Sequence, residues 1–374
     1  MSQAVRVTAR DEPRLPERMR AVLLTGHGDL DRLDYREDVP LPVVGRDDVL
    51  IRVAAAGVNN TDVNTRLGWY SKTITTGTEE AAAEGESRDD GAWSGVPLAF
   101  PRIQGADCCG RIVRVGGSVN ASRIGERVLV RPMMRPPDGS SPLPYWTLGS
   151  ECDGAFAEFV AVPAREAYCI ESAWSDVELA SLPCAYSTAE NLLHRAGAGE
   201  GERVIVTGAS GGVGSAAVQL AKRRGAHVTA VAGEAKADDV RALGADAVVS
   251  RDDDLVAALG RESVDVVVDV VGGPSWPALL DVLCQGGRLV TSGAIAGPIV
   301  ELDLRTLYLK DLSLLGCTLQ DEVVFENLIG YVERGEIVPV VARTYPLREI
   351  ARAQRDFMAK SFTGKLVLVV AESR

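Results

Sequence analysis

The stretch Val206-Thr-Gly-Ala-Ser-Gly-Gly-Val-Gly-Ser215 decides how this chain of 374 residues folds. It follows an apolar run at residues 203–206 and opens an amphipathic segment at residues 215–224. An apolar run, a glycine-rich turn and an amphipathic segment, in this order, are typical of a strand, a tight turn and the start of a helix. The sequence therefore predicts a βα unit at this point.

Small residues in this turn stand at the three positions of a dinucleotide-binding fingerprint, namely Ala209, Gly211 and Gly214. They serve a tight turn, a close approach of the backbone to a pyrophosphate, and close packing of the helix on the strand. The first N–H groups of a helix have no partner within the helix and are free to bind that phosphate. The alternative is a purely structural glycine turn in an unrelated α/β domain.

The sequence after the turn favours a dinucleotide-binding domain over a purely structural turn. A second strand is predicted at residues 227–231, followed by a helix that runs through Leu243-Gly-Ala-Asp246 and a third strand at residues 264–271. Strands and helices that alternate at this spacing build a parallel sheet with helices on its faces. The predicted fold class is α/β.

Bulk composition limits the function. With 46% hydrophobic and 25% charged residues, the chain has the composition of an ordinary globular protein. A net charge of −12 disfavours nucleic acid and anionic membranes as partners, because both need a basic face, so we expect a small-molecule substrate. We find no apolar run of about 18 residues and no secretory signal, which predicts a cytoplasmic protein. Seven cysteines without regular spacing fit reduced thiols.

Two patterns divide the chain. Short strands with glycine and proline punctuation fill residues 19–163, whereas strands and helices alternate from about residue 179 to about residue 320. We predict a catalytic domain at residues 1–178, a cofactor domain at 179–335, and a C-terminal return to the catalytic domain at 336–374. Residues 1–18 are predicted to be a loose arm.

An acidic segment at residues 73–95 interrupts the first domain and carries few hydrophobic residues. Its composition fits a disordered surface insertion. Its position after a candidate active-site segment fits a lid. The sequence leaves both interpretations open.

Beyond the glycine turn, the chain resembles the medium-chain dehydrogenase/reductase superfamily, and within it the zinc-independent quinone oxidoreductases and enoyl-thioester reductases. This resemblance implies a GroES-like β-barrel catalytic domain and a doubly wound Rossmann domain, with the active site between them. The motifs that carry it are Gly57-Val-Asn-Asn-Thr-Asp62, Gly105-Ala-Asp-Cys-Cys-Gly110, Val113-Arg-Val-Gly116, Gly125-Glu-Arg-Val128, Gly154-Ala-Phe-Ala-Glu-Phe-Val160, Leu243-Gly-Ala-Asp246, Asp269-Val-Val-Gly-Gly273 and Gly364-Lys365.

Zinc enzymes of the superfamily bind a catalytic metal through Cys, His and Cys, and the three matching positions here are Asn59, Ala106 and Cys184. An amide and a methyl group cannot replace a thiolate and an imidazole on tetrahedral zinc. The four-cysteine structural zinc lobe is also missing, because residues 133–149 hold no cysteine. We therefore expect no zinc.

Without a Lewis acid, hydride transfer favours acceptors that already delocalise negative charge, such as quinones and α,β-unsaturated carbonyls. The resemblance assigns two catalytic candidates. Tyr70, eleven residues after Asn59, matches the tyrosine proposed as proton donor in enoyl-thioester reductases, and Asn59 would orient the substrate. The alternatives are an aromatic residue that packs on the barrel rim and an asparagine that closes a turn.

Cofactor choice depends on the end of the second strand, where an acidic residue would bind the ribose of NAD. The superfamily position falls on Ala232, Gly233 leaves room, and Lys236 stands where NADPH-dependent relatives bind the 2′-phosphate. Glu234 lies at the general distance of a ribose carboxylate, which keeps NADH open. We favour NADPH.

The resemblance implies further cofactor contacts. They lie on the glycine turn, on the helix before it, after the next two strands and in the tail: Ser210, Gly212, Val213, Thr188, Gly272, Gly273, Ser292, Gly293 and Lys365. Relatives form a dimer through the segment that matches residues 300–319, so we expect a homodimer.

The predicted function is zinc-independent, NADPH-dependent reduction of a quinone or an α,β-unsaturated carbonyl or enoyl compound. Two rivals remain: a zinc-type alcohol dehydrogenase that acts on an alcohol or aldehyde, and a non-catalytic NADPH-binding redox sensor, since fold alone does not fix function.

Overall fold

A computed structural model describes residues 15–84, 97–135 and 145–370. Its parallel sheet has the strand order β13-β12-β11-β14-β15-β16. The order reverses between β11 and β14, so this is a doubly wound sheet, which binds ligands outside the carboxyl ends of its strands at the reversal point. The strands are β11 (Arg203–Val206), β12 (His227–Ala232), β13 (Ala247–Ser250), β14 (Val264–Asp269), β15 (Leu283–Thr291) and β16 (Ser313–Gly316).

Helices cover both faces of this sheet. Along β11, Val204 and Val206 join the core that contains α4 and α5, whereas Ile205 joins the core that contains α8. The predicted Rossmann domain is therefore confirmed. The helices of this region are α4 (Pro183–Ala196), α5 (Gly212–Arg223), α6 (Ala237–Ala242), α7 (Leu255–Leu259), α8 (Trp276–Val282), α9 (Leu304–Leu309) and α10 (Glu322–Glu333), with the 3-10 helix η4 (Glu234–Lys236).

A second sheet with the order β10-β6-β5-β3-β18-β17 carries the other core, and β9 pairs with β3. Its strands are β3 (Asp48–Val58), β5 (Cys109–Val115), β6 (Arg127–Val130), β9 (Phe159–Pro163), β10 (Ala167–Cys169), β17 (Val341–Pro346) and β18 (Lys365–Val369). Smaller sheets contain β1 (Arg18–Leu24), β2 (Leu33–Pro40) and β4 (Arg102–Ile103), and β7 (Met133–Met134) with β8 (Trp146–Thr147).

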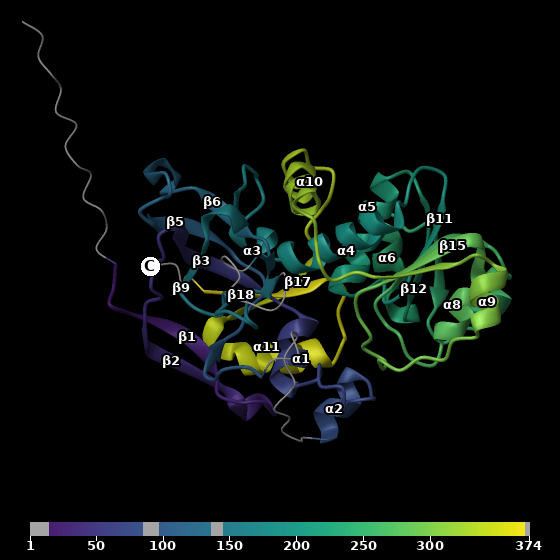
Figure 1. Ribbon diagram of the computed structural model, residues 1–374, viewed down its shortest axis with the longest axis horizontal. Helices are drawn as coiled ribbons and strands as arrows, with labels where there is room; N and C mark the ends of the chain where they lie inside the picture. The colour runs from purple at the N-terminus through teal and green to yellow at the C-terminus, as the bar shows by residue number, and fades with distance from the viewer. Residues whose placement is uncertain (1–14, 85–96, 136–144, 371–374) are drawn as a thin grey trace, which may run out of the picture.

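The last strand, β18, returns to the sheet that contains β3. β18 pairs antiparallel with β3, so that Val367 lies opposite Gly57. In Figure 1 the parallel sheet lies on the right, the second sheet on the left, and α4 runs between them. The other helices are α1 (Asn60–Leu67), α2 (Thr78–Glu84), α3 (Asp176–Leu179) and α11 (Ile350–Met358), with the 3-10 helices η1 (Leu30–Arg32), η2 (Ala121–Arg123), η3 (Ala164–Glu166) and η5 (Leu347–Glu349).

Two sequence predictions for the parallel sheet were wrong in detail. The helix α6 ends at Ala242 and does not run through Leu243–Asp246, because Gly244 adopts a φ of 108° that a helix does not allow. The strand that follows, β13, was missed, so the predicted third strand is the fourth, β14, which ends at Asp269. Strands of four residues are too short to show a clear periodicity.

Three sequence predictions fall partly outside the described residues: the loose arm at 1–18, the end of the segment 73–95, and part of the region 133–149. Among the described residues, none of the helices has the length and apolar character that a bilayer crossing requires. All seven cysteines lie in the described part and none forms a disulfide.

Candidate functional site

A buried polar cluster lies where the two sheets meet. Lys365 Nζ donates to Asp107 Oδ2 at 2.9 Å and to Asn59 Oδ1, and Asn59 Nδ2 donates to Asp107 Oδ2 at 2.8 Å. All three side chains are buried, and Lys365 is 2% exposed. A buried charge is stable only when it is paired and hydrogen-bonded, and Asp107 is the counter-ion of Lys365.

Separate elements bring these side chains together. Asn59 is the residue before α1, Asp107 precedes β5, and Lys365 is the first residue of β18. Asp107 Oδ1 also accepts from the backbone N–H of Cys184, at the start of α4, at 2.6 Å. Gly57 makes room for this carboxylate, since a Cβ there would lie 2.8 Å from the Ala180 carbonyl oxygen and closer still to Asp107.

Asp62 fixes the backbone of this cluster. Its Oδ2 accepts from the Asn59 N–H at 2.8 Å, which holds the first turn of α1. Burial raises the pKa of Asp62 to about 7, with a smaller contribution from the Asp107 charge. Burial and the Asp107 charge also raise the pKa of the Cys184 thiol, so that Cys184 is protonated at neutral pH. Asp62 and Cys184 are therefore both weak acids that lie beside the ion pair of Asp107 and Lys365.

We expect Asp62 to make stability depend on pH. Unfolded, Asp62 titrates near its ordinary value of 3.8, so between 3.8 and about 7 only the folded protein holds the proton. The stability that this proton contributes is present at low pH and is lost as the pH rises to about 7. From about pH 5 to about pH 8, wild type should lose about 3 kcal/mol relative to Asp62→Asn, measured by urea unfolding. Parallel pH profiles for the two proteins would contradict this.

Tyr70 lies beside the cluster. Its hydroxyl donates to Thr61 Oγ1 at 3.2 Å, and its ring packs edge-on against Trp69. Burial raises the pKa of Tyr70, so the phenol is neutral over the physiological range. Cys184 and Asp62 lie close enough to contribute to this shift whenever they are ionised. Tyr70 and Asn59, the two predicted catalytic residues, therefore border the same group of side chains.

The glycine turn has the geometry of a phosphate cradle. Gly208 has a φ of 58°, and Gly211, which precedes α5, is exposed. A Cβ on Gly214 would lie 2.7 Å from Ala209 Cα and closer still to the Gly208 carbonyl oxygen, so helix and turn touch there. Gly208 was missed as the residue that needs a positive φ.

The other predicted cofactor residues lie at the carboxyl ends of β14 and β15 or on α4. Asp269 accepts from Thr207 Oγ1 at 2.6 Å and from Gly272 N, which shapes the turn at Gly272 and Gly273. After β15 come Ser292, whose buried hydroxyl has no hydrogen-bond partner among the described residues, and Gly293. Thr188 is half-buried on α4, and Ser210 and Val213 are half-buried in the glycine turn. An orphan hydroxyl and an open glycine cradle both fit a dinucleotide.

Cations gather at the end of β12. Gly233 faces Arg251, whose Nε would lie 3.9 Å from a Cβ at residue 233. Burial lowers the pKa of Lys236, and the nearby Arg251 charge lowers it further. Lys236 Nζ donates to the Lys360 carbonyl, whereas Glu234 is exposed. The sequence analysis did not name Arg251 as a cofactor residue. Arg251 directly follows β13, so finding it required the prediction of β13, which was also missed.

The first part of the acidic segment packs against the cofactor region. Thr78 N donates to the Ile295 carbonyl at 3.0 Å and Thr78 Oγ1 to Asn64 Oδ1 at 3.1 Å, while Trp69 Nε1 donates to the Thr76 carbonyl at 3.1 Å. Residues 73–84 are thus folded, and Figure 1 shows α2 below the gap between the two sheets. The rest of the segment lies outside the described residues, and its role as a lid stays a prediction.

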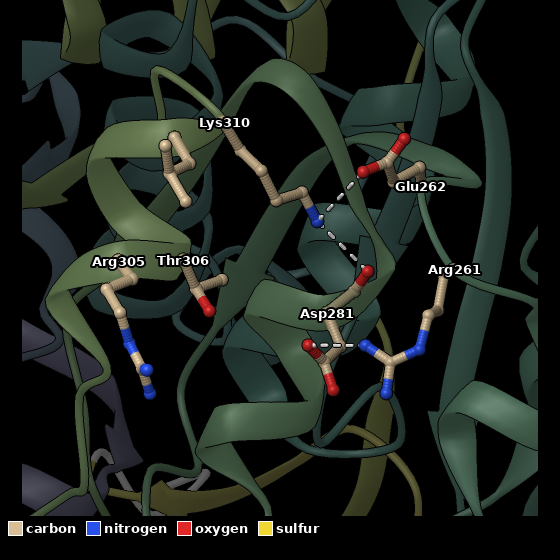
Figure 2. Close-up of a pocket in the computed structure, with 7 residues that line it drawn as sticks. Arg261, Glu262, Asp281, Arg305, Thr306 and Lys310 are labelled. Carbon is tan, nitrogen blue, oxygen red and sulfur yellow. Dashed lines mark hydrogen bonds and ion pairs between the residues drawn. The ribbon is translucent and has the colours of Figure 1, made fainter.

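A surface pocket of about 390 Å³ lies elsewhere, beside α8 and α9. Figure 2 shows how its charges pair: Arg261 binds Asp281 at 2.8 Å, and Lys310 faces Glu262 and the Asp281 carbonyl. The partner of Arg305 is Asp303, at 3.0 Å. In the described part of the chain, no group of three or more His, Cys, Asp or Glu side chains is arranged to hold a metal ion.

Two family models and several known proteins match the chain. The model for the alcohol dehydrogenase GroES-like domain matches residues 45–172, and that for zinc-binding dehydrogenase matches residues 212–334. Quinone oxidoreductase of Mus musculus is 30% identical over 94% of this chain and 98% of its own length. The chain belongs to the medium-chain dehydrogenase/reductase superfamily.

Other members of the superfamily are similarly close. Acryloyl-coenzyme A reductase of Sulfurisphaera tokodaii is 28% identical over 94% of this chain and 99% of its own length. A candidate alcohol dehydrogenase of Sinorhizobium meliloti, of known structure, is 46% identical, covers 95% of this chain and 97% of its own, and superposes with a TM-score of 0.85. The predicted superfamily, fold class and oxidoreductase class are confirmed. The chain is an enzyme that uses a nicotinamide cofactor.

Proposed function

We propose that this oxidoreductase reduces a quinone or an α,β-unsaturated carbonyl or enoyl compound with NADPH and without zinc. The observation that carries the proposal is the Asn59–Asp107–Lys365 cluster. Asn59 and Cys184 stand at two of the three positions that bind metal in zinc enzymes. Here an ammonium, a carboxylate and an amide that hydrogen-bond to one another lie at and between these two positions. A cationic side chain in this place disfavours a second cation.

When bound, the nicotinamide supplies a hydride, and the residues described here have to hold the acceptor and manage its negative charge. Quinones and enones accept hydride without a Lewis acid because they delocalise that charge. The names of the quinone oxidoreductase and the acryloyl-coenzyme A reductase, which cover nearly the whole chain, support the same substrate class.

NADPH is favoured over NADH by charge at the end of β12. Lys236 and Arg251 lie beside Gly233, which is expected to face the ribose of the cofactor. Cations at this position favour NADPH because they bind its 2′-phosphate. The other proposed contacts are the residues of the glycine turn from Ala209 to Gly214, Thr188, Gly272, Gly273, Ser292, Gly293 and the stem of Lys365.

Tyr70 is proposed as the donor that protonates carbon after hydride addition to an enoyl substrate, with Asn59 as the amide that orients the substrate. Tyr70→Phe removes only the hydroxyl, so the fold should be retained, with an unchanged melting temperature as control. We expect kcat to fall about 100-fold with enones and enoyl thioesters and less than about tenfold with quinones, which are protonated on oxygen. An equal, small loss with all substrates would make Tyr70 a packing residue.

A second candidate function follows from the structural relative with 46% identity, a candidate alcohol dehydrogenase. Metal analysis of protein purified without added zinc separates the two. One zinc per chain, together with alcohol oxidation that a chelator abolishes, would favour the alcohol dehydrogenase. NADPH binding without turnover of any acceptor or alcohol would favour a redox sensor.

We also propose a cytoplasmic homodimer that forms through the β16 edge of the parallel sheet. β16 is the last strand of that sheet, and Leu304, Tyr308 and Leu309 on the adjacent α9 are 63%, 63% and 66% exposed. Apolar side chains beside an unpaired strand edge are typical of an interface. Leu309→Asp should convert the dimer to a monomer in light scattering, whereas a wild-type monomer would refute the dimer.

A further inference from the structure

The ammonium of Lys365 has more N–H donors than it has acceptors among the described residues. A protonated lysine has three N–H donors. Within the described residues, Lys365 Nζ has two acceptors, Asn59 Oδ1 and Asp107 Oδ2. The third N–H is left for a ligand.

The stem of Lys365 connects the cofactor turn to the polar cluster. A Cβ on Gly212 would lie 2.7 Å from Lys365 Cδ, so the stem passes over the glycine turn. The preceding residue is fixed to the same turn, because Gly364 N donates to the Ser210 carbonyl at 2.9 Å. The ammonium is therefore held between the cofactor turn and the Asn59 side chain.

The partners of Lys365 hold it in place. Asp107 uses both carboxylate oxygens, one for Cys184 N and one for Lys365 and Asn59. Asn59 is fixed at its side chain by Asp107 and at its backbone by Asp62. An ammonium held in a buried site needs little reorganisation to stabilise a new negative charge.

We propose that Lys365 is the catalytic residue that receives the negative charge on the acceptor oxygen and, when the acceptor is a quinone, protonates that oxygen, with Asp107 and Asn59 as positioning residues. This proposal rests on the proposed function. Hydride addition to an enone forms a C–H bond and leaves an electron pair on the carbonyl oxygen, whereas addition to one quinone oxygen forms an O–H bond and leaves the pair on the opposite oxygen. With a quinone, one N–H bond of Lys365 then breaks as the second O–H bond forms, and the neutral amine takes its proton back from water. With an enone, the Lys365 ammonium hydrogen-bonds the enolate oxygen while Tyr70 protonates the carbon. Cofactor and acceptor together consume one proton for each turnover.

The first test compares holoenzymes with NADPH and the acceptor that wild type reduces fastest. Lys365→Met keeps the stem and removes the charge, and Lys222→Met, at a surface pair with Asp246, is the matched control. We expect Lys365→Met to lower kcat about 100-fold and to change the Kd for NADPH, measured by fluorescence, less than about threefold. A full kcat with a weakened Kd would make Lys365 a cofactor ligand only and overturn the proposal.

The second test needs no turnover. p-Nitrophenol serves as the oxygen probe on the NADP+ complex, and phenolate absorbance is followed against pH. Wild type should lower the pKa of the bound phenol by about one unit, a tenfold shift toward phenolate, and Lys365→Met should not. Equal behaviour of the two proteins overturns the proposal whether or not Lys365→Met is stable enough for kinetics.

The two tests also separate the proposal from the function on which it rests. A wild type that reduces none of the acceptors but lowers the phenol pKa through Lys365 overturns the proposed function and keeps the oxygen-binding role of Lys365. A wild type that reduces acceptors as fast as Lys365→Met overturns the role of Lys365 and keeps the function.

Discussion

Gly214→Ala should produce a protein that loses about 3 kcal/mol or more of stability before any cofactor is added. The new methyl group would meet the Gly208 carbonyl oxygen and, at 2.7 Å, Ala209 Cα. Both are backbone atoms of the glycine turn and cannot rotate away, so α5 would have to move off β11. Urea unfolding of the apoprotein measures this loss directly.

Gly211→Ala is the matched control, and it should have the opposite result. Gly211 has a φ of −76°, which alanine tolerates, and among the described residues its Cβ would have only the Gly208 carbonyl oxygen within 4 Å, at 3.3 Å. The methyl group would stand instead where the pyrophosphate approaches the backbone. We expect apoprotein stability to fall by less than about 1 kcal/mol, far less than in Gly214→Ala, and the Kd for NADPH to rise about 100-fold. If Gly211→Ala binds NADPH normally, the cofactor does not lie on this turn.

Lys236→Glu should raise the KM for NADPH about 100-fold and leave the KM for NADH within about threefold, because the new carboxylate repels a 2′-phosphate that only NADPH carries. Arg251→Glu should act in the same direction, since Arg251 lies close enough to lower the pKa of Lys236. Initial rates with the two cofactors measure the effect.

Arg241→Glu serves as the control for this charge reversal. Arg241 lies on the nearby helix α6 and pairs at the surface with Asp238 at 2.8 Å. It should leave both KM values unchanged. If Lys236→Glu and Arg241→Glu behave alike, the cations at the end of β12 do not choose the cofactor, and Glu234 becomes the residue to test for NADH.

Local patterns carried the fold prediction well where they were long or rich in glycine. The glycine turn, β11 and β12 were predicted from residues that are adjacent in the chain. The four-residue β13 was missed because so short a strand shows no clear periodicity. The end of α6 at Ala242 was misplaced although its signal, Gly244, stands in the sequence.

The candidate site was predicted only in part, for a physical reason. Lys365 and Asn59 are 306 positions apart, and the hydrogen bond between them exists only because β18 pairs with β3. The sequence named both residues but gave them unrelated roles. The composition of residues 73–84 likewise left disorder open, although Gly77 and Thr78 contact Ile295 across the two regions.

The most direct test of the proposed function is the rate of NADPH oxidation by chelator-treated protein with a short series of quinones, enones and enoyl thioesters. Zinc-independent reduction predicts turnover of at least one class at a rate that the chelator does not change, with well under one zinc per chain. Loss of all turnover on chelation, restored by one zinc per chain and accompanied by alcohol oxidation, would contradict it.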